Sequence, residues 1–124
     1  MRIIIVDDEQ ELVITLSERL GFRGIESDWA INGPDAIQLV SENTYDLAVL
    51  DVKLPGMSGL ELKKKLQRIA PKMKFIFVTG HGSQADFQTG AQEAGAEYYL
   101  IKPVNIDVLI EKMKEVLKLK EGDS

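Results

Sequence analysis

Apolar residues follow two alternating patterns along the chain. Short unbroken runs are typical of strands covered on both faces of a parallel sheet, and they occupy residues 3–6, 47–50, 75–78 and 98–101. The segment Gly24–Trp29 differs, because acidic side chains occupy every second position in part of it, which predicts a strand at a sheet edge. The pattern therefore predicts five strands.

Longer segments between these runs repeat apolar residues at helical spacing. Leu12, Leu16 and Leu20 are spaced by four residues, and similar stripes cover residues 36–40, 62–69, 87–94 and 106–117. Five strands that alternate with five helices predict right-handed βαβ units, and hence a parallel sheet with helices on both faces.

Residues at the helix boundaries support this assignment. Asn32 and Asn105 are typical of helix N-termini, since their side chains can accept a hydrogen bond from the first turn. Gly21 and Gly95 are predicted to end the first and fourth helices. Gly59 indicates tight packing where the third helix begins.

Composition narrows the classes of protein that fit. The chain has 124 residues and a net charge of −5, which argues against binding along a nucleic-acid backbone. It has no cysteine, which is compatible with the reducing cytoplasm. We expect neither a signal peptide nor a membrane span. We expect one domain over residues 1–119, with a polar tail over 120–124 that frays or begins a linker.

Polar residues that could bind a ligand or take part in a reaction lie at the ends of the predicted strands. Asp7 and Asp8 come after the first strand, Asp51 ends the third, and Thr79 and Lys102 end the fourth and fifth. Ligands of open α/β sheets bind beyond these carboxyl ends. Three carboxylates repel one another there. Mg²⁺ or Mn²⁺, which prefer oxygen ligands, would bind their oxygens and neutralise their charge.

A simpler interpretation is that the first acids only stabilise a helix N-terminus. That interpretation does not explain Asp51 or Lys102, which belong to other strands. Together, the residues could accept a phosphoryl group: a carboxylate attacks phosphorus, a cation clamps its oxygens, and an ammonium and a hydroxyl bind the rest. These residues therefore indicate a binding site rather than a helix N-cap alone.

Four sequence motifs resemble the receiver domain of two-component response regulators. They are I-I-I-V-D-D-E at 3–9, A-V-L-D-V-K-L-P-G-M-S-G at 48–59, F-V-T-G-H-G at 77–82 and A-G-A-E-Y-Y-L-I-K-P at 94–103. The resemblance covers essentially the whole chain. It implies a doubly wound, flavodoxin-like (βα)5 fold with strand order 2-1-3-4-5, which is a common order among doubly wound sheets.

The resemblance also implies roles for the residues of the site. Asp51 would be the phosphoacceptor, and Thr79 and Lys102 would bind the phosphoryl group. Asp8 would hold Mg²⁺ directly and Asp7 mainly through water. The third protein ligand would be the backbone carbonyl of Lys53.

Further positions have implied roles. The Lys102–Pro103 peptide is expected to be cis, which X–Pro bonds allow. Tyr99 matches an aromatic switch residue that turns inward when Thr79 moves toward the phosphoryl group. His81 and Lys53 border the path of attacking water and are predicted to tune the lifetime of the phosphoryl group.

The implied function is a signalling switch that catalyses only its own phosphorylation and dephosphorylation. Its partners would be a sensor histidine kinase or histidine phosphotransfer protein and an output domain or target, contacted through the fourth helix, fifth strand and fifth helix. Gly90 and the polar residues 82–84 indicate that this fourth helix is the mobile element. A homodimer is left open. The alternatives are a phosphorelay intermediate and an interaction module that works without phosphorylation.

Other interpretations fit less well. A flavodoxin-type electron carrier would not place acids 7–9 where phosphate binds, a dehalogenase-type phosphatase needs a D-x-D motif, and a P-loop is absent. The basic runs Lys63–Lys65 and Lys112–Lys120 are interpreted as solvated helix faces, so no nucleic-acid partner is expected.

Overall fold

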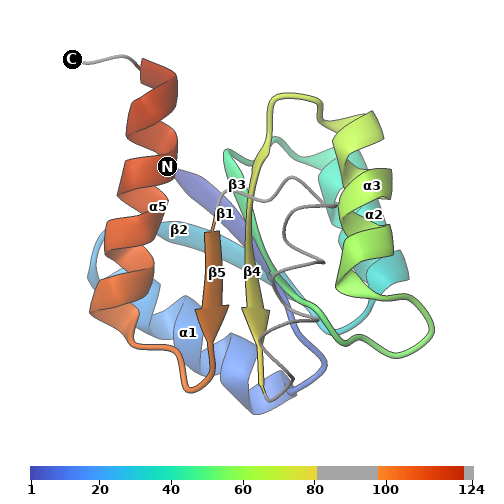
Figure 1. Cartoon of the computed structure of the whole chain (residues 1–124), viewed down its shortest axis with the longest axis horizontal. Helices are drawn as coiled ribbons and strands as arrows, with labels where there is room; N and C mark the ends of the chain where they lie inside the picture. Colours follow the sequence, from blue (N-terminus) through green and yellow to red (C-terminus); the bar gives the residue numbers. More distant parts are fainter. Residues whose placement is uncertain (81–97, 122–124) are drawn as a thin grey trace.

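The computed structural model describes residues 1–80 and 98–121, and its centre is one parallel sheet (Figure 1). The strand order is β2-β1-β3-β4-β5, as the resemblance implies. Every neighbouring pair is parallel. The strands are β1 (Arg2–Val6), β2 (Glu26–Ala30), β3 (Leu47–Asp51), β4 (Lys74–Thr79) and β5 (Tyr98–Ile101).

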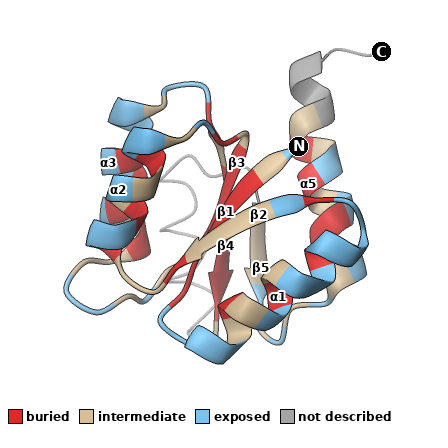
Figure 2. Ribbon diagram, turned by 180° about the vertical axis from the view of Figure 1, so that it is seen from behind, coloured by how far each residue is buried: buried red, intermediate tan, exposed pale blue. Residues whose placement is uncertain are grey.

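Helices cover both faces of the sheet. They are α1 (Gln10–Phe22), α2 (Gly33–Glu42), α3 (Gly59–Ile69) and α5 (Ile106–Glu121). Helices α1 and α5 lie on one face and α2 and α3 on the other (Figures 1 and 2). The helix expected over residues 87–94, with its proposed mobility and its terminal Gly95, lies outside the described residues. None of the helices within residues 1–80 and 98–121 is both long and apolar enough to cross a membrane.

Among the residues that the structure describes, the core consists of two apolar clusters, one on each face of the sheet. Successive strand residues point to opposite faces, so Ile3 and Ile5 join the cluster under α1 and α5, whereas Ile4 and Val6 join the one under α2 and α3. The central strands are buried on both sides (Figure 2). This explains why their sequences are continuously apolar rather than alternating.

Two sequence predictions about local structure are wrong. Helix α1 continues past Gly21, and the left-handed residue after it is Gly24, with φ 78°. The amide of Ile25 donates to the carbonyl of Leu20 and that of Gly24 to Gly21, a Schellman pattern that needs a residue with positive φ at position 24. Gly24 is therefore outside strand β2.

The second error concerns Lys63, which was expected on a solvated face but is only 6 % exposed. Each helical residue is rotated by about 100° from the last, so Lys63 turns inward while Lys64 and Lys65 stay exposed. The Lys63 ammonium lies 5.3 Å from the centre of the Phe75 ring and 3.1 Å from Gln67 Oε1.

Other helix starts are as predicted. Asn32 Oδ1 accepts a hydrogen bond from the amide of Asp35 at 2.8 Å. Asn105 Oδ1 accepts from the amides of Asp107 and Val108 at 2.9 and 3.1 Å. These caps fix where α2 and α5 begin, just beyond the carboxyl ends of β2 and β5.

The connection from β3 to α3 is tightly packed. A Cβ on Gly59 would lie 2.1 Å from the carbonyl oxygen of Asp51, a separation that no side chain tolerates. The Gly59 amide donates to the carbonyl of Val52 at 2.8 Å, and Ser58 forms a capping box with Glu61. Helix α3 therefore holds the backbone at Asp51 in place.

Candidate functional site

Three carboxylates meet at the carboxyl end of the sheet. One oxygen from each of Asp7, Asp8 and Asp51 lies within 4.8 Å of the others. Asp7 and Asp51 are buried, with 4 % and 6 % of their surface exposed, while Asp8 is exposed. Strands β1 and β3 are neighbours with Val6 opposite Leu50, which places the residues that follow side by side.

Lys102 supplies a positive charge to this cluster. Its ammonium lies 2.7 Å from Asp7 Oδ2 and 3.3 Å from Asp51 Oδ2, and its side chain is 16 % exposed. The backbone amide of Lys102 also donates to the carbonyl of Thr79 at 2.8 Å, which ties the end of β5 to the end of β4. The structure thus brings together the acids and the lysine that the sequence predicted.

Glu9 is a member of the site that the sequence interpretation missed. Its Oε1 lies 2.7 Å from the Lys102 ammonium, although the side chain is 62 % exposed. Glu9 is also the N-cap residue of α1, but its side chain makes no capping hydrogen bond. The run of three consecutive acids was the only signal in the sequence.

The simpler interpretation of residues 7–9 as a helix cap does not account for this geometry. The Glu9 amide donates to Asp7 Oδ1 at 2.9 Å, while the other oxygen of Asp7 faces Lys102. Asp51 is held in the same way, because its Oδ1 accepts from the Lys53 amide at 3.1 Å and its Oδ2 faces Lys102. Backbone amides therefore orient both buried carboxylates toward one point.

Burial and charge shift the acidities of these groups. Burial raises the pKa of Asp7, and its neighbour Asp51 raises it further, against the lowering effect of Lys102. Burial lowers the pKa of Lys102, but the hydrogen bonds to Asp7 and Glu9 outweigh burial and raise it overall. Lys102 therefore stays charged at neutral pH and only partly offsets the crowded carboxylates.

The residues expected to respond to phosphorylation lie on the neighbouring strands β4 and β5. Thr79 ends β4 and is 7 % exposed. Tyr99 on β5 packs against Phe77, with ring centres 5.2 Å apart, and burial raises the pKa of its phenol to about 12. The Lys102–Pro103 peptide is cis, as the resemblance implies. His81 lies outside the described residues.

A divalent cation fits these residues. In the described part of the chain, the Lys102 ammonium contacts Asp7, Glu9 and Asp51, and Asp8 lies beside two of these, so the set carries an excess of negative charge when ionised. Carboxylate oxygens are the ligands that Mg²⁺ and Ca²⁺ prefer. A bound cation would reverse the electrostatic penalty of gathering Asp7, Asp8 and Asp51.

Comparison with known proteins identifies the family. A family model described as the response regulator receiver domain matches residues 3–114. The chain belongs to this family. It is a receiver, a signalling domain of two-component response regulators.

Two curated relatives show how the receiver occurs in longer and shorter proteins. The sporulation initiation phosphotransferase F of Bacillus subtilis is 34 % identical over 121 residues, which cover 98 % of this chain and 97 % of that protein. The two-component response regulator PhoP of Pseudomonas aeruginosa is also 34 % identical, but the match covers 98 % of this chain and only 54 % of PhoP. The receiver therefore spans about half the length of that relative.

Solved structures share the fold. A CheY-like receiver domain protein from Methanospirillum hungatei has a TM-score of 0.88 and 38 % identity, with 97 % of this chain and 95 % of that one covered. TrrA from Thermotoga maritima, solved with Mg²⁺ and BeF, has a TM-score of 0.79 and 36 % identity, with coverages of 93 % and 97 %.

A third structure, a response regulator from Burkholderia pseudomallei, contains a phosphorylated aspartic acid and a calcium ion. It has a TM-score of 0.83 and 26 % identity, with 98 % of this receiver and 72 % of that chain covered. Members of the family thus bind divalent cations, in agreement with the acidic cluster of Asp7, Asp8 and Asp51.

Proposed function

We propose that this receiver is a switch that accepts a phosphoryl group on Asp51 in the presence of Mg²⁺. The observation that carries the proposal is the position of Asp51: a buried carboxylate with one oxygen on a backbone amide and the other 3.3 Å from the Lys102 ammonium. The donor would be a sensor histidine kinase or a histidine phosphotransfer protein, and the recipient of the signal an output domain or target protein.

The residues of the site would divide the work of phosphoryl transfer. An oxygen of Asp51 attacks phosphorus, and the P–N bond of the phosphohistidine breaks with its electron pair returning to the imidazole nitrogen. Lys102 and the Thr79 hydroxyl bind phosphoryl oxygens as positive charge and hydrogen-bond donor. Asp7, Asp8 and the backbone carbonyl of Lys53 would hold Mg²⁺, which neutralises charge between carboxylate and phosphate when bound.

The response would pass from Thr79 to Tyr99. A phosphoryl group adds about two negative charges and three acceptor oxygens, so Thr79 is drawn toward Asp51 and the space it leaves admits the Tyr99 ring. We propose that this shifts the population of two arrangements of the surface around β5 and α5. Lys53 and His81 would border the path of hydrolytic water and set how long the phosphoryl group lasts.

Acetyl phosphate tests the assignment of Asp51. Incubation with Mg²⁺ should add one phosphoryl group, measured by intact mass, and Asp51→Asn should abolish the addition. Asp35→Asn is a matched control, because Asp35 is an exposed aspartate outside the cluster. Labelling of Asp51→Asn at another residue would overturn the assignment. Absence of labelling in the wild type would favour an interaction module that works without phosphorylation.

A phosphorelay intermediate is the second candidate. One observation favours it: the full-length match to a phosphotransferase, which covers 97 % of that protein. An intermediate must return its phosphoryl group to a histidine. Receiver labelled with ³²P and mixed with a histidine phosphotransfer protein should transfer the label reversibly, whereas a terminal switch should release it only as inorganic phosphate.

A further inference from the structure

A groove opens at the end of the sheet opposite the acidic cluster. Its volume is about 470 Å³, within the range of ligand sites. The end of α2 and the loop to β3 line one side, and the end of α3 and the loop to β4 line the other. The residues that line it include Tyr45, Asp46, Ile69 and Lys72. Ile69, 42 % exposed, offers an apolar side chain to a partner.

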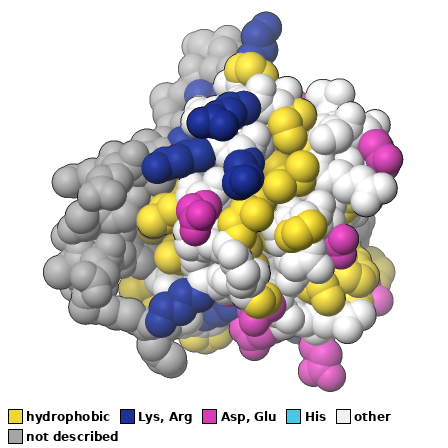
Figure 3. All heavy atoms as spheres, turned by 90° about the vertical axis from the view of Figure 1, so that its right-hand side faces the viewer, with side chains coloured by type: hydrophobic (Ala, Val, Ile, Leu, Met, Phe, Trp, Pro, Cys, Tyr) yellow, Lys and Arg dark blue, Asp and Glu magenta, His cyan; other side chains and the backbone are white. Residues whose placement is uncertain are grey.

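Four exposed cations lie on α3 and the following loop, beside this groove. They are Lys64, Lys65, Arg68 and Lys72, of which Lys72 also lines the groove. Figure 3 shows basic side chains gathered on the α2–α3 side next to a band of apolar ones. Such a cluster is unexpected in a chain of net charge −5.

The charges of this basic cluster are not neutralised within the described residues. None of the four forms an ion pair with another side chain of residues 1–80 or 98–117. The one acid on α3, Glu61, is at the right spacing for Lys64 and Lys65. Its carboxylate instead faces the amide and hydroxyl of Ser58, each at 3.4 Å.

The spacing within the basic cluster disfavours the isolated helix. Arg68 is four residues from Lys64 and three from Lys65, so the three like charges share one face of α3 and repel. An acidic partner would remove this repulsion and gain attraction at the same time. Neighbouring Ile69 and the groove would bury an apolar side chain from the same partner.

We propose that this surface binds an acidic peptide segment of a partner protein, with an apolar side chain in the groove and carboxylates on Lys65, Arg68 and Lys72. The site is separate from the acidic cluster: Tyr45 and Asp46 precede β3, whereas Asp51 ends it, about 15 Å farther along the strand. Binding there leaves Asp51 accessible, so this inference goes beyond the proposed function and does not depend on it.

Fluorescence anisotropy of the intact chain with a labelled peptide of leucines flanked by glutamates tests this site. The double variant Lys65→Glu/Arg68→Glu should weaken binding by about tenfold or more, and Ile69→Ser should weaken it with little change in salt dependence. Lys114→Glu and Val108→Ser on α5 are matched controls, since Lys114 is exposed and Val108 is 41 % exposed. Both controls should bind as the wild type does.

Thermal unfolding of each variant verifies that the fold is intact. A peptide with lysines in place of the glutamates should not bind. The proposal is overturned if the α3 and α5 variants lose binding equally, if Ile69→Ser has no effect, or if double-stranded DNA binds this surface more tightly than the acidic peptide.

Discussion

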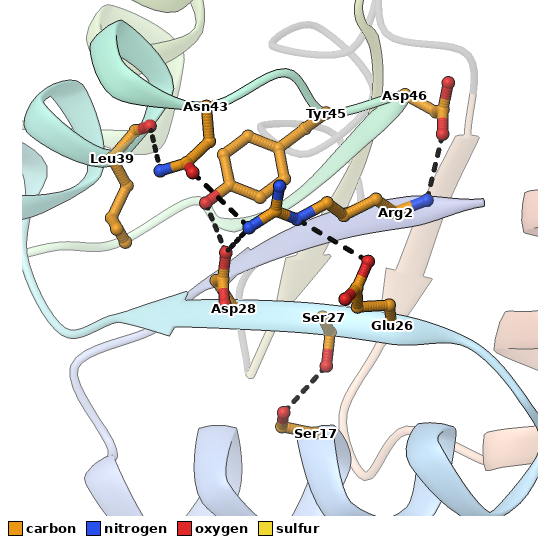
Figure 4. A network of polar contacts seen from close by, with 9 residues as sticks. All are labelled: Arg2, Ser17, Glu26, Ser27, Asp28, Leu39, Asn43, Tyr45 and Asp46. Carbon is orange, nitrogen blue, oxygen red and sulfur yellow. Dashed lines mark hydrogen bonds and ion pairs between the residues drawn. The ribbon is translucent and has the colours of Figure 1, made fainter.

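The two ends of the sheet use the same kinds of side chain in opposite ways. At the end where the strands begin, the Arg2 guanidinium lies 3.0 Å from Asp28 Oδ2 and over the Tyr45 ring, 5.2 Å from its centre (Figure 4). The Tyr45 hydroxyl donates to Asp28 at 2.6 Å, and the Arg2 amide donates to Asp46 at 2.9 Å. Each charge has an opposite charge or a donor beside it.

At the end where the strands finish, one ammonium contacts Asp7, Glu9 and Asp51, while Asp8 stands close to two of them. Backbone amides orient Asp7 and Asp51, and the single charge of Lys102 offsets only part of the negative charge of the four carboxylates. Buried charge that lacks full compensation costs stability. The end where the strands begin therefore contributes to folding, whereas the end where they finish retains a repulsion that binding can relieve.

The largest effect is expected from a change in the backbone that supports the acidic cluster at the carboxyl end of the sheet. Gly59→Ala places a Cβ 2.1 Å from the carbonyl oxygen of Asp51, so the start of α3 or the end of β3 must move. We expect a loss of about 3 kcal/mol in the free energy of unfolding, measured by urea denaturation, because overpacking of this kind forces backbone shifts.

Gly21→Ala is the matched control for that substitution. Gly21 lies within α1, and a Cβ there has no atom within 4 Å. Alanine should therefore stabilise the receiver by about 0.5–1 kcal/mol through helix propensity. Equal effects of the two substitutions would show that the contact with Asp51 is not what requires glycine at position 59.

At the end where the strands begin, Asp28→Ala should lower the free energy of unfolding by about 2 kcal/mol. Asp28→Ala leaves the Arg2 guanidinium without its nearest carboxylate and the Tyr45 hydroxyl without its acceptor. Glu26→Ala is the control: it lies 3.8 Å from Arg2 but is 74 % exposed, so its removal should cost less than about 0.5 kcal/mol. Similar denaturation midpoints for both variants would contradict the network.

The same end predicts a dependence on alkaline pH. Burial and then the hydrogen bond to Asp28 raise the pKa of the Tyr45 phenol above its usual value of 10.0. A group whose folded pKa is raised contributes stability that is complete below the unfolded pKa and declines above it. The advantage of the wild type over Tyr45→Phe should therefore shrink by about 1 kcal/mol at pH 10.5. Parallel stability curves would refute this.

The fold was predictable because four of the strands contain continuously apolar runs and β2 has an alternating pattern. β5 was predicted with its observed bounds, and β1 and β3 each differ by one residue. Helix termination was less predictable: Gly21 and Gly24 are both plausible, and only the hydrogen bonds to Leu20 and Gly21 select Gly24. Sequence pattern identifies glycine but not the residue that takes positive φ.

The candidate site was predictable to the extent that the strands position it. Asp7 and Asp8 follow β1, Asp51 ends β3 and Lys102 follows β5, so parallel topology brings them together. Glu9 was missed because it lies 93 positions from Lys102 in the sequence. Their contact depends on the conformations of two long side chains, which the sequence pattern does not show. Lys63 was misplaced because composition alone does not show which member of a lysine run turns inward.

The smallest predicted effect is a change in Tm, and its sign distinguishes the acidic cluster from the end where the strands begin. Asp8→Asn removes one charge from three crowded carboxylates, so without divalent cation it should raise Tm by about 2 °C. With saturating Mg²⁺ the order should reverse, because the wild type gains more binding energy than the variant. Differential scanning calorimetry in EDTA and in MgCl₂ measures both, with Asp35→Asn as a control whose response to Mg²⁺ matches the wild type. A variant less stable than the wild type in EDTA would mean that Asp8, like Asp28, contributes to folding, and the contrast between the two ends would then fail.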